Sequence, residues 1–457
     1  MTKPSDSLHS SEDLGAELDR QGIRFHKIAV TDTDGVMRGK YVCRDKFLSA
    51  ARSGLGFCDV VLGWDSNDKL YDNSKVSGWH TGYRDAPVKL DLESMRRIPF
   101  EPDTGLWLGS FEGTYADACP RTMLARMAAK ARSLGFEALG AAEYEFFLFD
   151  ETPTSARDKG YRDLKPFTPG MFGYSLLRAG VHVDLYQELL GTFNAMGIEI
   201  EGLHTETGPG VLEAALRYGP IERAADNATI FKTYAKILAQ RRGLMATFMA
   251  KWSADYPGQS GHLHVSLMRD GRNAFYDPAA PSTMSATMRH FVAGQVALLP
   301  ELLPMICPTI NSYRRLVPGM WAPLAANWGV ENRTTAIRVI AGEHGQRSEF
   351  RIGPADANPY LGLAAALGAG LYGIEKQLSL TDAIEGNAYD LQAKGAAGTP
   401  LASDLGQAAA AFKASKAARE LFGDTFVDHF AATREWEVRE HQRHVSDWDL
   451  ARYFEII

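Results

Sequence analysis

Hydrophobic and polar residues alternate in two different ways along this chain. Up to about Thr114 the apolar residues form short extended runs at residues 25–31 and 57–63, and Asp34-Gly35 is typical of a turn between strands. The pattern therefore predicts a small, sheet-based domain at residues 1–114.

From residue 115 onward, helical periodicity alternates with strands. Pro120 is typical of the start of a helix that we expect to reach residue 134, and Gly135 is typical of its end. The Ala- and Gly-rich residues 392–400 predict a flexible excursion. We expect an α+β domain with a mostly antiparallel sheet at residues 115–457. Its further helices are predicted at residues 181–196, 221–244, 284–298, 360–377 and 426–441.

The bulk composition is that of an ordinary globular protein. The chain has 457 residues, of which 45% are hydrophobic and 23% are charged, so one large and one small domain fit its length. A formal net charge of -7 disfavours nucleic acid and anionic membranes as partners and leaves small molecules. The polar start has no signal-peptide core, which predicts a cytoplasmic protein. The 4 cysteines show no CxxC spacing, so we interpret them as reduced and structural.

Four short polar fragments interrupt the apolar patterns. In an extended strand, alternate side chains share one face, so the outer residues of each three-residue fragment can aim at one point. The first fragment runs directly into the apolar residues 146–149, which are typical of a buried strand that would hold two carboxylates rigidly. Buried carboxylates need cations, so the sequence predicts a multi-metal site. The fragments are Glu143-Tyr144-Glu145, residues 206–213, His262-Leu263-His264 and Glu349-Phe350-Arg351.

Residues 206–213 place Glu206 and Glu213 on either side of a turn that Gly and Pro form readily. The alternative interpretation is an acidic hairpin on the surface. Carboxylate oxygens suit Mg²⁺ or Mn²⁺, and histidines among them favour Mn²⁺ slightly. The fragments supply enough ligands for two such ions.

Two further stretches are suited to anions. Residues 251–266 form a Gly-containing loop whose backbone amides can approach phosphate, and Gly261 directly precedes His262. Guanidinium groups bind carboxylates and phosphates through paired hydrogen bonds. Arg314 and Arg347 could instead be surface residues in ordinary salt bridges. The arginines of the second stretch are Arg314, Arg315, Arg333, Arg338, Arg347 and Arg351.

Taken in order, these fragments resemble the glutamine synthetase family from about Gly22 to the carboxyl terminus, and within it the branch that makes γ-glutamylamines (γ-glutamylpolyamines and γ-glutamylalkylamides). The resemblance implies a β-grasp-like amino-terminal domain followed by a catalytic domain with an antiparallel sheet and surrounding helices. It also implies ATP and two or three Mg²⁺ or Mn²⁺ ions as cofactors. The motifs that carry it are Asn311-Ser312-Tyr313-Arg314-Arg315-Leu316-Val317-Pro318-Gly319, Ala322-Pro323, Asn332-Arg333, Arg338 and Asn358-Pro359-Tyr360.

The resemblance assigns roles residue by residue. The first metal position falls to Glu145, Glu206 and Glu213, and the second to Glu143, His262 and Glu349. Contacts with the nucleotide or its phosphates fall to His264, Ser266, Arg333, Arg338 and Arg347, and contacts with glutamate to Gly258, Arg315 and Arg351. One departure is Pro257, which stands where the family has an asparagine. The catalytic set implied is Arg315, Arg333, Arg338 and Asp72.

The family's amino-terminal domain lends a loop to the neighbouring subunit's site, in two stacked rings of six. Residues 71–79 resemble that loop, and Asp72 matches an aspartate that helps to bind ammonium. The flanking residues differ from the family pattern, and Asp65 is a second candidate. The resemblance therefore implies a dodecamer with sites shared between subunits.

The main departure is Trp321, which stands where ammonia-using members have a glutamate that takes a proton from ammonium. An indole cannot accept that proton, but it offers an apolar wall and a face for an alkylammonium group. We therefore expect an ATP-dependent ligase that joins the γ-carboxylate of glutamate to an organic amine, such as an alkylamine, ethanolamine or a polyamine, in amine catabolism. The alternatives are an ordinary glutamine synthetase that recruits another base, and a non-catalytic regulator or scaffold.

Overall fold

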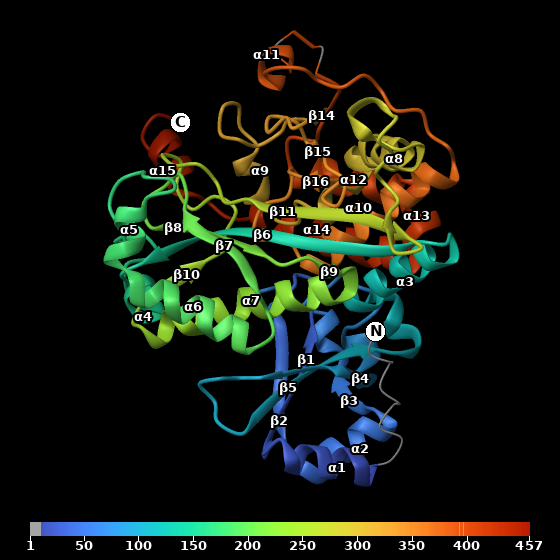
Figure 1. The fold of residues 1–457 in the computed structure, drawn as a ribbon. Coiled ribbons are helices and arrows are strands. Elements are labelled where there is room, and N and C mark those ends of the chain that lie inside the picture. The colour runs from blue at the N-terminus through green and yellow to red at the C-terminus, as the bar shows by residue number, and fades with distance from the viewer. Residues whose placement is uncertain (1–10, 393, 396) are drawn as a thin grey trace.

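The computed structural model describes residues 11–392, 394–395 and 397–457, and it has an α+β architecture in which a small sheet lies below a much larger one (Figure 1). The small sheet is mixed: its central strands β1 and β5 are parallel, and the outer pairs are antiparallel. This arrangement is of the β-grasp type that we expected. In order across the sheet, its strands are β2 (Met37–Val42), β1 (Phe25–Thr31), β5 (Thr104–Phe111), β4 (Asp85–Arg97) and β3 (Leu55–Cys58).

The large sheet is almost entirely antiparallel, as predicted, and its one parallel pair in the described residues is β14 with β15. Its main path runs through β14 (Trp328–Val330), β15 (Ile337–Ile340), β16 (Arg347–Phe350), β11 (Gly261–Arg269), β6 (Glu137–Phe149), β8 (Val211–Leu216) and β7 (Ile200–Thr205). Short strands pair beside this path or elsewhere: β9 (Gly219–Pro220), β10 (Met245–Thr247), β12 (Arg272–Asn273), and the separate pair β13 (Ala325–Ala326) and β17 (Thr399–Pro400).

Helices surround both sheets, and the six long ones predicted from the sequence are present within a few residues. Near the small sheet lie α1 (Ser11–Arg20) and α2 (Arg44–Ser53). The others are α3 (Pro120–Ser133), α4 (Pro153–Asp158), α5 (Leu176–Val181), α6 (Val183–Ala195), α7 (Ile221–Arg241), α8 (Ala286–Leu302), α9 (Ser312–Arg315), α10 (Pro359–Glu375), α11 (Ala388–Gln392), α12 (Leu405–Ala414), α13 (Lys416–Phe422), α14 (Asp424–Gln442) and α15 (Asp447–Tyr453). The short 3₁₀ helices are η1 (Asp59–Leu62), η2 (Trp79–Thr81), η3 (Gly113–Ala118), η4 (Pro281–Thr283) and η5 (Leu303–Met305).

Two local predictions need correction. Residues 57–63 do not form one extended run, because β3 ends at Cys58 and η1 follows. The buried Asp59 accepts hydrogen bonds from Ser77 and Tyr115, which holds the chain in a turn there. Within residues 392–400, Thr399 and Pro400 pair with β13, so the segment is not simply an excursion, while Ala393 and Ala396 lie outside the described residues.

The two faces of the large sheet differ in character. Tyr144 points toward α7, where its ring stacks on that of Phe231 with centroids 6.3 Å apart. Since side chains alternate along β6, Glu143 and Glu145 point to the opposite face. Figure 1 shows α6 and α7 beneath the sheet, and the loops around α9 and β14–β16 above it. One face is thus the apolar core, and the other carries the polar fragments.

A tight turn joins the small sheet to the helices of the larger part. Asp34 and Gly35 form the predicted turn, and Gly35 has a φ of 86°. Asn358 donates to the backbone oxygens of Asp32 and Thr33 at 3.3 and 3.1 Å. Arg434 on α14 forms an ion pair with Asp34 at 2.6 Å. These buried contacts fix the position of the small sheet relative to the helices of the larger part. The domain boundary between residues 114 and 115 stays a prediction.

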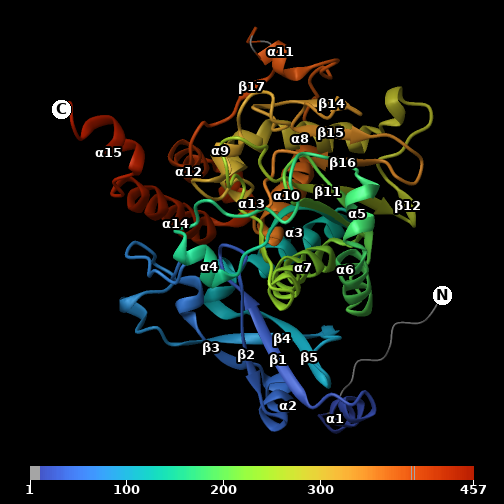
Figure 2. The ribbon, with the colours of Figure 1, turned by 90° about the vertical axis from the view of Figure 1, so that its left-hand side faces the viewer.

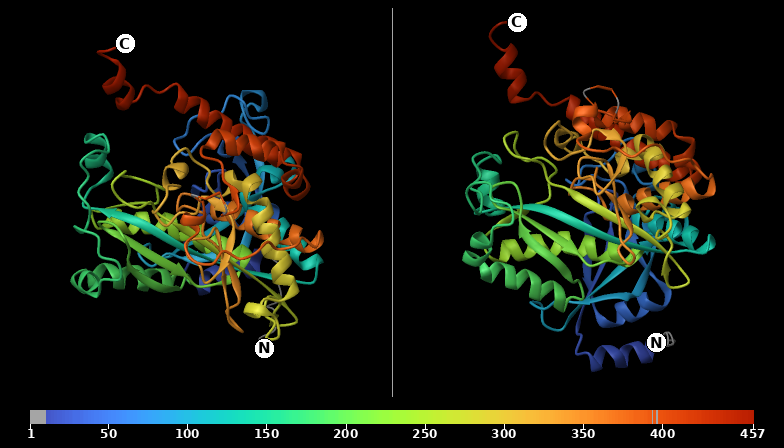
Figure 3. Two further views of the ribbon diagram at one scale, coloured as in Figure 1. Left: turned by 90° about the horizontal axis from the view of Figure 1, so that it is seen from above. Right: turned by 45° about the horizontal axis from the view of Figure 1, so that its top comes forward.

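The carboxyl-terminal α15 projects away from the body beyond α14 (Figure 2), and the view from above shows the same arm extending past the large sheet (Figure 3). None of the helices in the described ranges is both long and apolar enough to cross a membrane.

Candidate active site

The register of the large sheet brings the predicted polar residues into one row. Glu143 on β6 lies directly opposite His262 on β11, and the next inward-facing residue, Glu145, lies opposite Glu213 on β8. Because cross-strand partners have Cβ atoms about 5 Å apart, these side chains can share ligands. Residues 119 and 68 positions apart in the sequence therefore become neighbours through strand pairing.

The row continues toward both edges of the sheet. Glu349 on β16 pairs with His264 on β11, and Arg338 on β15 pairs with Glu349. At the other side, His204 on β7 pairs with Glu213. The turn predicted at residues 206–213 is present, since β7 and β8 are antiparallel neighbours on either side of it. Each strand from β15 to β7 thus contributes at least one polar side chain, and β6 and β11 contribute two each.

A cavity of about 440 Å³ opens over this row. All six predicted metal ligands line it, together with the residues predicted to hold glutamate and with Trp321. The predicted site residues that line this cavity are Glu143, Glu145, Glu206, Glu213, His262, Glu349, Gly258, Arg315, Arg351, Arg333, Arg338 and Trp321.

The carboxylates on the β6 and β8 side repel one another when no cation is present. Burial, and then the charges of Glu145, Glu143 and Glu206, raise the pKa of Glu213 to about 9. Burial likewise raises the pKa of Glu145, although Ser260 donates a backbone hydrogen bond to that carboxylate. A cation between these groups would relieve both effects, because it favours their ionised forms.

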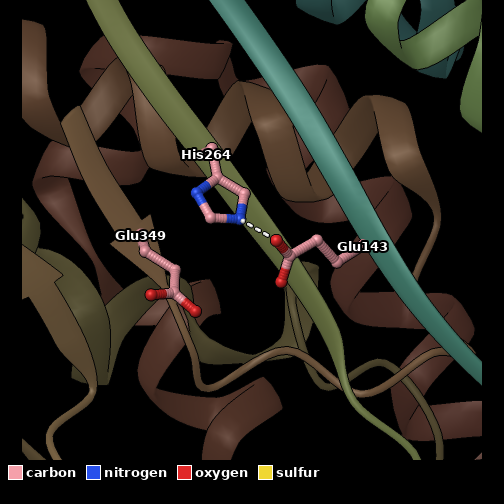
Figure 4. Close-up of side chains that lie close together, drawn as sticks. All are labelled: Glu143, His264 and Glu349. Atoms are coloured by element: carbon pink, nitrogen blue, oxygen red, sulfur yellow. Dashed lines mark ion pairs between the residues drawn. The ribbon is translucent and has the colours of Figure 1, made fainter. Parts of the chain in front are cut away.

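On the other side, two histidines lie against Glu143 and Glu349. His262 Nδ1 is 3.5 Å from a Glu143 oxygen and 3.4 Å from a Glu349 oxygen. His264 Nε2 is 3.2 Å from the other Glu143 oxygen, and Figure 4 shows this ring between Glu143 and Glu349. Burial, and then the charge of Arg351, lower the pKa of His262 to about 4, so its ring is neutral at pH 7.

These donors fit divalent cations. The buried Nε2 atom of His262 has no hydrogen-bond partner among the described residues, and a neutral imidazole nitrogen is a metal ligand. Two groups bring ligand atoms within 4.8 Å of one another: Glu143, His264 and Glu349, and His204, Glu206 and Glu213. Both histidines of β11 therefore lie beside Glu143, whereas the resemblance names His262 alone as a metal ligand.

His204 was missed by the sequence reasoning. It lies two residues before Glu206, and in a strand that spacing places both side chains on one face, so strand periodicity alone could have found it. Its ring nitrogens are 3.7 Å from a Glu206 oxygen and 3.9 Å from a Glu213 oxygen.

Arg315 and Arg351 are both buried arginines of the cavity, and Arg315 is the more deeply buried. It is 2% exposed, and Nη1 donates to the backbone oxygen of Ile352 at 3.1 Å. Gly258 lies against it so closely that a Cβ at position 258 would come within 2.7 Å of Arg315 Cγ. Arg351 donates to Glu349 and, at 3.2 Å, to the backbone oxygen of Arg333. The predicted glutamate contacts are therefore neighbours on one wall of the cavity.

A second cavity, of about 1000 Å³, adjoins the first at Glu143 and Ala215. His264, Ser266 and Arg347, which the sequence assigned to the nucleotide, line this larger cavity. Arg347 Nε donates to His264 Nδ1 at 3.2 Å, so Arg347 is not the surface residue of the alternative interpretation. Three of the five predicted nucleotide residues thus line the larger cavity, whereas Arg333 and Arg338 line the smaller one with the predicted glutamate residues.

Two aromatic residues stand at the smaller cavity, and both have strained backbones. Trp321 is 57% exposed with a φ of 58°, and Tyr174 is 64% exposed with a φ of 55°. The Tyr174 ring stacks on that of His204, with centroids 4.4 Å apart, and its backbone nitrogen donates to Thr205 at 2.7 Å. Bulky residues with positive φ are uncommon, and strain of this kind gathers at functional sites. Nothing in the sequence pattern singled out Tyr174.

Neither candidate aspartate is among the described residues that line this chain's own cavity. Asp72 is an exposed residue that pairs with Arg439 of α14. Asp65 accepts backbone hydrogen bonds from Asn67 and Lys69 at 2.9 and 2.8 Å, so its carboxylate closes a local turn. Within one chain, therefore, neither Asp72 nor Asp65 lies beside the polar residues that cross the large sheet.

Comparison with known proteins identifies the class to which this fold and site belong. Residues 117–453 match the family described as glutamine synthetase, catalytic domain. The chain belongs to the glutamine synthetase family.

Its relatives within the family carry two kinds of name. The chain is 45% identical to type-1 glutamine synthetase 2 of Dictyostelium discoideum, over 95% of this chain and 84% of that protein. It is 36% identical to a glutamate–isopropylamine ligase of a Pseudomonas species, over 96% of this chain and 97% of that protein. A solved GmaS/ADP complex superposes with a TM-score of 0.84 at 26% identity, covering 96% of this chain and 99% of that one.

Proposed function

We propose that this protein is a carbon–nitrogen ligase that uses ATP to join the γ-carboxylate of glutamate to a small organic amine, in amine catabolism. One observation carries the choice of amine: Trp321 lines the cavity that contains Arg315, Arg351 and the carboxylate row. The name of the Pseudomonas relative, a glutamate–isopropylamine ligase, supports the same choice.

Glutamate would bind in the smaller cavity. Arg315 and Arg351 present guanidinium groups to an anionic substrate, and Gly258 lets the backbone approach Arg315. ATP would occupy the larger cavity at His264, Ser266 and Arg347, with its γ-phosphate directed toward Glu143, where the cavities meet. The ADP bound to the solved relative supports a nucleotide site in this fold.

Two or three divalent cations would be held by the carboxylates and histidines of the row. When bound, such ions neutralise phosphate charge and leave the carboxylates ionised. The donors suit Mg²⁺ or Mn²⁺. They are Glu145, Glu206 and Glu213 at one position, and Glu143, His262 or His264, and Glu349 at the other.

The reaction has two steps. A γ-carboxylate oxygen of glutamate attacks the γ-phosphorus of ATP and releases ADP. The bound alkylammonium first releases one proton to solvent, and the neutral amine nitrogen then attacks the resulting acyl phosphate at its carbonyl carbon. Phosphate leaves with the bonding electron pair and takes up the second proton that the nitrogen loses. Arg333 and Arg338 face this part of the cavity, where their charges would stabilise the transferred phosphoryl group.

The amine would enter between Trp321 and Tyr174. Their ring faces attract an alkylammonium group through cation–π contacts and exclude water from its apolar part. The indole of Trp321 does not accept a proton at neutral pH. Burial and the neighbouring Glu206 raise the pKa of the Tyr174 hydroxyl above its ordinary value, so this hydroxyl stays protonated and cannot act as a base either. This pocket therefore recognises the carbon chain of an amine, which ammonium lacks.

The second candidate is glutamine synthesis from ammonia, supported by the 45% identity to the Dictyostelium glutamine synthetase. In that case Asp72 of a neighbouring subunit would supply the ammonium contact from its exposed loop. A site completed by a neighbouring subunit requires an oligomer. We propose a cytoplasmic dodecamer made of two stacked rings of six subunits. The domain division at residues 114 and 115 is part of the same proposal.

The test is to incubate purified protein with ATP, Mg²⁺, glutamate and isopropylamine and to analyse the products by mass spectrometry. The proposal expects γ-glutamylisopropylamide together with equal amounts of ADP and phosphate, and no product when any substrate is omitted. Glutamine formed from ammonium, with no γ-glutamylamide from any amine, would favour the second candidate. No phosphate release with any nitrogen donor would favour a non-catalytic protein.

A further inference from the structure

Glu331 has a strained backbone, and both oxygens of its carboxylate accept hydrogen bonds. It directly follows β14 and has a φ of 51°, a conformation that L residues rarely adopt. Its backbone nitrogen donates to Val339 at 2.9 Å, which fixes it beside β15. A strained backbone conformation persists only where neighbouring contacts enforce it, and such residues gather at functional sites. The strain at Glu331 therefore suggests a functional role for this residue.

The carboxylate of Glu331 is directed at Arg338. One oxygen, Oε2, accepts hydrogen bonds from both Nε, at 3.1 Å, and Nη2 of Arg338. The other oxygen, Oε1, accepts from the backbone nitrogen of Ala341 at 3.2 Å. Glu331 is therefore tied to both ends of β15, and its side chain, 47% exposed, covers a guanidinium that is only 15% exposed.

Arg338 is held from a second side as well. Its Nη1 donates to Glu349 Oε2 at 3.0 Å. A guanidinium has five N–H groups, so these contacts use three of them and leave two for a ligand in the cavity that Arg338 lines. Two carboxylates thus hold the plane of one arginine, and long arginine side chains otherwise have many rotamers.

From these contacts we infer that Glu331 is a positioning residue, which holds Arg338 in the orientation that receives the transferred phosphoryl group. This inference rests on the proposed function, since it acts through the phosphate role proposed for Arg338. Glu331 is not among the described residues that line either of the two cavities. The positive φ of Glu331 directs its carboxylate toward Arg338 and away from solvent.

Three variants separate this role from a merely structural one. Glu331→Gln keeps the shape and removes the charge, and Glu331→Gly removes the carboxylate and the strain together. Gln377→Gly is the matched control, because Gln377 has the same φ of 51° at the exposed end of α10, away from the cavity. We expect kcat for glutamate- and amine-dependent phosphate release to fall about 10- to 100-fold in both Glu331 variants, because misplaced catalytic groups cost rates of that order. The KM for glutamate should change little, and Gln377→Gly should retain the wild-type kcat.

A double-mutant cycle with Arg338→Lys then tests whether Glu331 acts through Arg338. A lysine lacks the guanidinium fork, so in that background Glu331→Gln should change kcat by less than about twofold. An equal loss in both backgrounds, or wild-type kcat in folded Glu331→Gln and Glu331→Gly proteins, would overturn the inference while leaving the proposed function intact. If the wild-type protein itself releases no phosphate with any amine, the proposed function fails first and the inference falls with it.

Discussion

Gly258 packs directly on the side chain of Arg315, and an added Cβ would lie 2.5 Å from the backbone oxygen of Ala250 and 2.7 Å from Arg315 Cγ. Gly258→Ala must therefore push Arg315 out of its buried position. We expect the KM for glutamate to rise about tenfold or more, because displaced binding groups lose affinity steeply. Steady-state kinetics at saturating ATP measure this effect.

The control for that substitution is Gly191→Ala. Gly191 lies on α6 with nothing within 4 Å of an added Cβ, so its replacement should leave the KM for glutamate unchanged. A normal KM in Gly258→Ala would show that Arg315 does not hold glutamate.

Trp321 decides the nucleophile in our account. Trp321→Glu should shift the ratio of kcat/KM values toward ammonium by at least about tenfold, because a carboxylate can accept the ammonium proton and removes the apolar wall. Trp321→Phe keeps an aromatic face and should retain the preference for amines. An unchanged amine profile in Trp321→Glu would remove Trp321 from the explanation.

Metal binding should release a proton. With a pKa of about 9, the Glu213 carboxyl is protonated at pH 7, and a bound cation displaces that proton. The affinity for Mg²⁺ should therefore rise with pH between 7 and 9, by up to roughly tenfold per unit. Calorimetry in buffers of different ionisation enthalpy measures both the affinity and the released proton. Glu213→Gln should bind Mg²⁺ weakly with no such pH dependence, and equal wild-type affinity at pH 7 and 9 would contradict the account.

The loop around Asp72 should loosen in acid through His429. This buried histidine on α14 hydrogen-bonds Ser74 at 3.2 Å, and burial, followed by the charge of Arg434, lowers its pKa to about 4. An unfolded histidine has a pKa near 6.5, so the unfolded chain binds the proton first as pH falls. The free energy of unfolding should drop by about 3 kcal/mol at most between pH 6.5 and 4. His429→Gln should lack this part of the pH dependence in denaturation experiments, and identical slopes for both proteins would refute it.

The two-residue alternation of side chains in strands predicted more of the site than the periodicity of the helices did. Because side chains in strands alternate faces, Glu143 and Glu145, or His262 and His264, could be paired from sequence alone. The order of strands across the sheet could not, since it depends on long-range pairing that places Glu349 of β16 beside β11.

Other features depend on backbone geometry that the sequence does not announce. Tyr174 and Glu331 reach the site region through positive φ angles, which ordinary residue patterns do not reveal. Asp72 was assigned by resemblance, and in one chain it pairs with Arg439 on α14, so the role proposed for Asp72 would need a neighbouring subunit.

The central claim is that an organic amine, and not ammonium, is the preferred nucleophile. The most direct test measures ATP- and glutamate-dependent phosphate release across a panel of alkylamines, ethanolamine, polyamines and ammonium, and compares kcat/KM. Our account predicts that at least one organic amine exceeds ammonium. Ammonium exceeding every organic amine would contradict it.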